Sequence, residues 1–84
     1  ENTPPFNSLL SPNPFTTQAT IRFSKEIYNA TFSLYNLLGE KVKEISGISG
    51  ESFQINRGIL LSGVYIFEIM EKDKQIAKGK AVVY

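Results

Sequence analysis

Glutamates are the side chains of this sequence whose type and spacing come nearest to supporting chemistry. Glu40 with Glu44, and Glu68 with Glu71, form two pairs close in sequence, and paired carboxylates can act as general acid and base. The chain has neither histidine nor cysteine, so it lacks nucleophile–base pairs and thiolate ligands. Asp73 is its only aspartate, whereas calcium loops need several acidic ligands. We predict that the glutamates face solvent and that the chain holds no catalytic, metal or cofactor site.

The charge balance argues against a nucleic acid as the main partner. Lysine and arginine number 9 against 8 acidic residues, a net charge of +1, whereas a nucleic-acid surface needs concentrated positive charge. The lysines near the C-terminus are typical of a solvated strand face. No apolar run approaches the ~20 residues that span a bilayer. Residues from Glu1 onward do not have the pattern of a signal peptide, and we expect the signal of an exported parent to lie upstream. Because the chain starts at Glu1, we expect one small domain of a longer protein. From the charge balance and the lack of a catalytic or ligand site, we expect no nucleic-acid partner and no small-molecule substrate.

Alternation of apolar and polar residues predicts an all-β chain. Residues 1–5, with two consecutive prolines, are predicted to be a linker, residues 6–10 are a possible first strand, and residues 11–84 form the domain. Residues 24–29 and 71–75 are polar and are predicted connections. Period-2 patterns and β-branched or aromatic residues predict further strands at residues 18–23, 30–36, 51–56, 63–70 and 76–84.

Residues 38–46 leave two structures open. Their apolar residues have the spacing of one helix face. A helix of about nine residues would be unstable alone and would contain Gly39, so we favour a hairpin with Gly39 in its turn and a strand at residues 40–46. A bulge near residues 43–44 would then explain the helical spacing. With a glycine-rich turn at residues 46–50, the count reaches about seven antiparallel strands, typical of a sandwich or barrel.

Gly63 and the apolar C-terminal residues can each be interpreted in two ways. Gly63 precedes the densest apolar strand, where a glycine relieves crowding or forms a bulge. The apolar C-terminal residues either close the core or form a recognition element, because a terminal edge strand would offer unpaired backbone groups to a receptor. The predicted core comes from interior strands and consists of Phe23, Phe32, Leu34, Phe53, Ile55, Tyr65 and Phe67.

Four motifs, in a fixed order that ends at the end of the chain, resemble a known family. They are "PNPFTTQATIRF" from Pro12, "FSLYNLLGEKV" from Phe32, "LLSGVYIFEI" from Leu60 and "GKAVV" from Gly79. Together they resemble the C-terminal sorting domain of the type IX, or Por, secretion system. The resemblance implies an immunoglobulin-like β-sandwich of about seven antiparallel strands.

The resemblance also implies a function for the chain. The domain would direct its parent protein, the cargo that precedes it, through the outer-membrane translocon of the type IX system, and a sortase-like C-terminal signal peptidase would then cut it off. The parent would be periplasmic in transit, and then at the outer-membrane surface or extracellular. The family's basic-then-apolar terminal segment falls on Lys78, Gly79, Lys80, Ala81, Val82 and Val83. The family often ends in a charged or amide residue, whereas this chain ends in Tyr84, which we include in the predicted sorting segment. Its structural motifs fall on Pro12, Asn13, Pro14, Phe15, Gly39, Gly63 and Tyr65.

The alternative is a non-catalytic module of a secreted enzyme, either fibronectin-like or carbohydrate-binding. Carbohydrate modules usually need exposed, flat aromatic side chains. This chain has no tryptophan and 4 tyrosines. We therefore favour the sorting domain, and a glycan panel would distinguish the two.

Overall fold

The structure is a computed structural model that describes residues 8–84. The predicted linker and the first two residues of the predicted first strand lie outside these residues. The all-β class is confirmed, because the described residues form strands and contain no helix. The strands are β1 (Ser8–Ser11), β2 (Gln18–Tyr35), β3 (Lys41–Asn56), β4 (Gly63–Glu71) and β5 (Lys74–Val83). A search of the same residues finds no helix long and apolar enough to cross a membrane.

Two of the strands are much longer than predicted: β2 has 18 residues and β3 has 16. Residues 24–29, predicted as a connection, lie inside β2, and the glycine-rich residues 46–50 lie inside β3. Pairing continues across these segments with shifts of register, and such bulges bend a strand without ending it. The seven-stranded immunoglobulin-like sandwich is therefore not confirmed, since residues 8–84 form five strands in one curled sheet.

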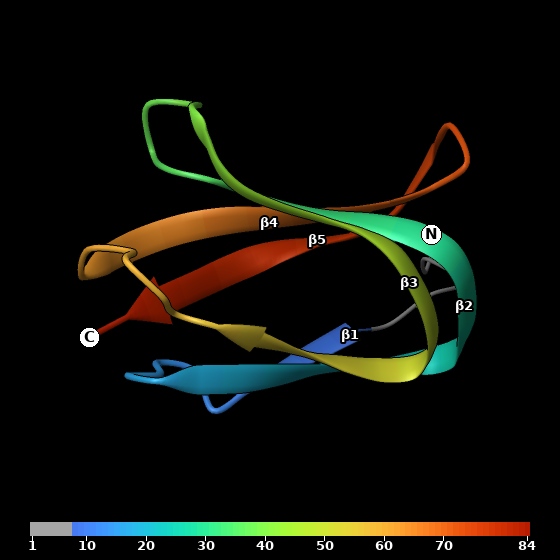
Figure 1. Cartoon of the computed structure of the whole chain (residues 1–84), viewed down its shortest axis with the longest axis horizontal. Coiled ribbons are helices and arrows are strands. Elements are labelled where there is room, and N and C mark those ends of the chain that lie inside the picture. The colour runs from blue at the N-terminus through green and yellow to red at the C-terminus, as the bar shows by residue number, and fades with distance from the viewer. Residues whose placement is uncertain (1–7) are drawn as a thin grey trace, which may run out of the picture.

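The long strands curl the sheet over on itself. β3 lies along one edge of β2, while β1 and then β4 lie along the other, and β5 pairs with β4. The two long strands bend together (Figure 1). Asn29 (φ 50°) and Gly50 (φ 115°) have positive φ where the register between β2 and β3 shifts. A bridge between Phe15 and Val83 joins the β1–β2 connection to the end of β5. The curl thus brings the last strand against residues near the start of the described chain.

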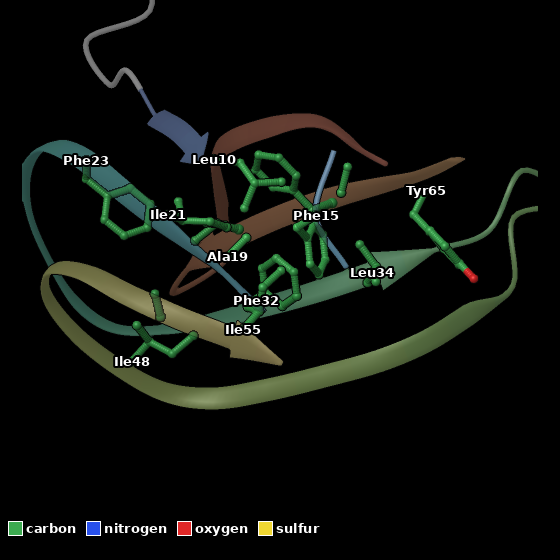
Figure 2. Close-up of a cluster of buried hydrophobic side chains, with 14 of the residues drawn as sticks. Leu10, Phe15, Ala19, Ile21, Phe23, Phe32, Leu34, Ile48, Ile55 and Tyr65 are labelled. Atoms are coloured by element: carbon green, nitrogen blue, oxygen red, sulfur yellow. The ribbon is translucent and has the colours of Figure 1, made fainter. Parts of the chain in front are cut away.

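The core lies inside the curl, where the two halves of the sheet face each other (Figure 2). Phe32 is fully buried, and its ring centroid lies 5.3 Å from that of Phe53 and 6.0 Å from that of Phe67. Each large apolar side chain buried in this way contributes about 1.5–3 kcal/mol to folding. The predicted core residues are buried apart from Phe53, which packs against the core and is partly buried. Residues missed by the prediction include Leu10, Phe15, Ile21, Ile27, Ile69, Ala81 and Val83.

The hairpin at Gly39 is confirmed, and the alternative helix is wrong. Gly39 has a φ of 88° in the turn between β2 and β3. The bulge lies earlier than predicted, because the register shifts between Leu34, which pairs with Lys43, and Tyr35, which pairs with Lys41. Val42 is the extra residue, and it is exposed.

We expect Gly39→Val to lower the free energy of unfolding by about 1–3 kcal/mol, because a β-branched residue resists positive φ. No atom lies within 4 Å of a Cβ built at Gly39, so the loss would come from the backbone and not from a clash. Urea unfolding monitored by circular dichroism measures it. Gly39→Asn, which tolerates positive φ better, is the control and should lose less. An unchanged urea midpoint for Gly39→Val would contradict the turn geometry.

Candidate functional site

Side chains of the predicted sorting segment alternate between the core and the surface. Ala81 and Val83 are buried in the core, and Gly79 is half-buried against it. The other four residues alternate with these, as the period of a strand requires, and we call them the outward face: Lys78, Lys80, Val82 and Tyr84. Only the outward face is available to a partner of the folded domain, so the inward residues have a structural role.

Gly79 is the residue that allows β5 to pack against a core ring. It pairs across the sheet with Phe67. A Cβ at Gly79 would lie 2.7 Å from two carbon atoms of the Phe67 ring, closer than non-bonded carbons approach. The glycine therefore leaves space for an aromatic ring that stacks in turn on Phe32.

Asn13 and Phe15 cover the outer edge of β5 at its C-terminal end. The Asn13 Nδ2 donates to the Lys80 carbonyl at 3.0 Å, and its Oδ1 accepts from the Val82 amide at 2.9 Å. The Phe15 amide donates to the Val82 carbonyl at 2.9 Å, and the Tyr84 amide donates to the Phe15 carbonyl at 3.0 Å. The expectation of unpaired backbone groups is thus wrong for Val82, and for the amide of Tyr84. A receptor cannot add a strand there without displacing residues 13–15.

The remaining motif residues support this arrangement. Pro12 and Pro14 flank Asn13 on the surface, and Phe15 is buried. Gly63 opens β4 opposite Val83. The next motif residue, Tyr65, is buried with its ring at the edge of the core (Figure 2), and its hydroxyl donates to the carbonyl of Leu61 at 2.6 Å.

Arg57, which the sequence analysis did not single out, joins three segments at the end of β5. Its guanidinium Nη1 donates to the main-chain oxygens of Tyr84 at 2.5 Å and Thr16 at 3.3 Å, and its Nε donates to the Leu60 carbonyl at 2.9 Å. Its Nη2 donates to the Ser62 hydroxyl at 3.2 Å. A fork of donors in a fixed plane suits this set of acceptors. The only local signal was an arginine between a strand and a glycine, which does not distinguish it from a surface residue.

We expect Arg57→Ala to lower the free energy of unfolding by about 1–3 kcal/mol, because several charge-assisted hydrogen bonds are lost together. Arg57→Lys should recover only part of this loss, since an ammonium cannot reproduce the fork. Urea midpoints of both variants provide the measurement. Arg22→Ala, at an exposed position on β2, is the control. Equal midpoints for Arg57→Ala and the control would contradict this role.

The β2–β3 turn is held by the side chain of Asn36 together with two backbone hydrogen bonds, from the Asn36 amide to the Glu40 carbonyl and from the Gly39 amide to the Asn36 carbonyl. The Asn36 Oδ1 accepts from the amides of Leu38 at 2.9 Å and Glu40 at 3.0 Å, while its Nδ2 donates to the Glu40 carboxylate at 2.7 Å. We call residues 36–40 the tip. Beside the tip lies a hollow of about 310 Å³, whose other wall is formed by Ile66, Glu68 and Lys78.

The glutamates are engaged separately and not as catalytic pairs. Glu44 accepts from Lys41 at 3.0 Å, and this hydrogen bond, with the carboxylate charge, raises the pKa of Lys41. Glu68 accepts from the Tyr35 hydroxyl at 3.3 Å, and Glu71 accepts from the Tyr28 amide at 2.7 Å. Among residues 8–84, no group of three or more acidic, histidine or cysteine side chains could hold a metal ion. The four glutamates of the two sequence pairs thus each have a separate hydrogen-bond partner.

Comparison with known proteins agrees with the motif pattern. No curated protein matches the chain. Residues 10–83 match the family described as the secretion system C-terminal sorting domain. The matched residues include the segment that covers the edge of β5, the tip, Arg57 and all of the sorting segment except Tyr84. This chain belongs to the family of type IX secretion system C-terminal sorting domains.

Proposed function

We propose that the chain carries a preceding cargo protein from the periplasm through the outer-membrane translocon of the type IX system, and that a sortase-like peptidase then removes it. The observation that carries this proposal is the family match over residues 10–83. A type IX sorting domain implies a cargo, the type IX machinery, and export across the outer membrane to the surface or the extracellular space. The family is not a catalytic one.

The fold supports a role as a folded sorting signal. Asn13, Phe15 and Arg57 fix the end of β5 by main-chain contacts, so the outward face has a defined position on the surface. Lys78 and Lys80 lie on that face and are exposed. We propose that the outward face is read by the translocon, with the lysines setting the orientation and rate of docking.

We propose that cleavage occurs in or before residues 1–5. Consecutive prolines at positions 4 and 5 disfavour a helix or a central strand, and segments without regular secondary structure are preferred sites of proteolysis.

A fusion experiment tests the proposed function. The whole chain, Glu1–Tyr84, is placed behind a fluorescent protein that carries an export signal, in a cell with the type IX machinery. The reporter should leave the cell without the domain, and the size of the released reporter gives the cleavage position. A known sorting domain in the same strain is the control. A reporter that stays in the periplasm, intact and folded, while the control is exported, would refute the proposal.

The carbohydrate-binding alternative has less support in the geometry. The two exposed tyrosines, Tyr28 and Tyr84, lie by opposite ends of β4: the Tyr28 amide bonds Glu71, whereas Tyr84 follows Val83, which pairs with Gly63. They therefore do not form one platform for a sugar ring. Binding of the isolated domain on a glycan panel would revive this alternative.

A further inference from the structure

The tip exposes two leucines that the rest of the domain leaves uncovered. Leu37 is 70% exposed and Leu38 is 85% exposed. Exposed apolar side chains scattered singly are ordinary, but adjacent ones beside a hollow point to an interaction site. The leucines are also held in place, because Asn36 bonds the amide of Leu38 and both the amide and carboxylate of Glu40. Binding of a partner would therefore cost little conformational entropy, because the turn is already ordered.

The hollow beside the tip combines apolar and charged walls. Leu37 and Ile66 contribute apolar surface, and Lys78 lies at its wall opposite Glu68 in the β4–β5 register. The same outer surface continues along β4 and β5 through two further cross-strand pairs, Ile66 with Lys80 and Val64 with Val82. The tip, the hollow and the outward face thus form one surface, which the curl of the sheet assembles from three strands.

The charges on this surface favour an acidic partner. The Glu68 carboxylate accepts a hydrogen bond from the Tyr35 hydroxyl. Among residues 8–84 one ion pair is formed, between Lys41 and Glu44. Within residues 8–84, neither Lys78 nor Lys80 has a carboxylate within ion-pair distance. A carboxylate on a partner would complement these two ammonium groups.

We propose that this surface binds a protein of the export machinery. The partner would have an apolar pocket that receives Leu37 and Leu38, and carboxylates at the rim of that pocket would contact Lys78 and Lys80. This deepens the proposed function and rests on it. A protein fits better than a lipid bilayer, because polar residues, among them Glu68 and Tyr35, line the hollow beside the apolar ones. Hydrocarbon would desolvate the Glu68 charge, which accepts a hydrogen bond from the Tyr35 hydroxyl at 3.3 Å, whereas a polar protein rim can supply further donors.

The test compares two doubly substituted fusions of the whole chain. Leu37→Asp with Leu38→Asp should reduce the export rate about tenfold or more, as expected for the loss of a central apolar contact. Leu9→Asp with Ile59→Asp makes the same change at positions 63% and 99% exposed, away from the hollow, and should export at the wild-type rate. Melting curves of the isolated chain check that both variants fold. If the leucine double variant does not fold, Leu38→Asp alone is used in its place.

Each result decides the proposal. Normal export of the folded leucine variant, or an equal loss in the control variant, would overturn it. Binding of the wild-type chain to vesicles of anionic phospholipid, lost in the leucine variant, would assign the surface to a membrane and also overturn it. Failure of the proposed function is distinguishable, because then the wild-type fusion itself stays in the cell while a known sorting domain is exported, and both proposals fall.

Discussion

Gly79→Val is expected to lower the free energy of unfolding by about 3 kcal/mol, at the upper end of the range for overpacking a well-packed core. Even the first added carbon would lie 2.7 Å from the Phe67 ring. That ring cannot move aside freely, because Phe67 is buried and stacks on Phe32 with the centroids 6.0 Å apart. For a domain of this size such a loss is a large part of the total stability. Urea unfolding of the purified chain measures it.

Two further variants separate the clash from a general effect of substitution in β5. Lys80→Val places the same side chain at an exposed position next to Gly79, and should change stability by no more than about 0.5 kcal/mol. Phe67→Leu combined with Gly79→Val should show a favourable coupling energy, because the smaller side chain vacates the space. A Gly79→Val variant as stable as Lys80→Val would show that the ring yields without cost.

The sequence predicted the local structure better than the continuity of the strands. Alternation located the pairing segments, and Gly39 located the hairpin, because both signals depend on neighbouring residues. The polar residues 24–29 and the glycine-rich residues 46–50 have the composition of turns, yet they stay paired through bulges. Ile27 against Gly50 and Ala30 against Ile48 maintain the pairing there. Composition does not show that two bends lie opposite each other, so two pairs of predicted strands were single strands.

The location of the sorting segment stays a prediction, and the sequence did not show how packing and exposure divide its residues. The motifs indicated the C-terminal segment and residues 12–15, but not that Asn13 bonds the backbone of Lys80 and Val82, across sequence separations of 67 and 69. Gly79 was expected to take part in recognition, and the structure gives it a packing role against Phe67. Arg57 was missed because its acceptors come from three segments that meet only after the sheet has curled.

Deletion of residues 81–84 is expected to unfold most of the domain and to abolish export. It removes Ala81 and Val83 from the core, together with their pairing to Gly63 and Tyr65 of β4. It also removes the acceptors and donors that hold Asn13, Phe15 and Arg57. Loss of the buried valine alone costs about 1.5–3 kcal/mol, in a domain that has about 5–15 kcal/mol in all. The circular dichroism melt of the truncated chain should lack a cooperative transition.

Loss of export in that deletion would not identify a recognition element, because an unfolded chain fails for either reason. Lys78→Gln with Lys80→Gln separates the two, since both positions are exposed. Glutamine is preferable to glutamate, because Glu68 lies directly across from Lys78, and two opposed carboxylates destabilise a sheet. The melt should stay within about 0.5 kcal/mol of wild type, while export slows if the ammonium groups steer docking. Wild-type export of this variant would remove the lysines from recognition and leave the apolar part of the outward face.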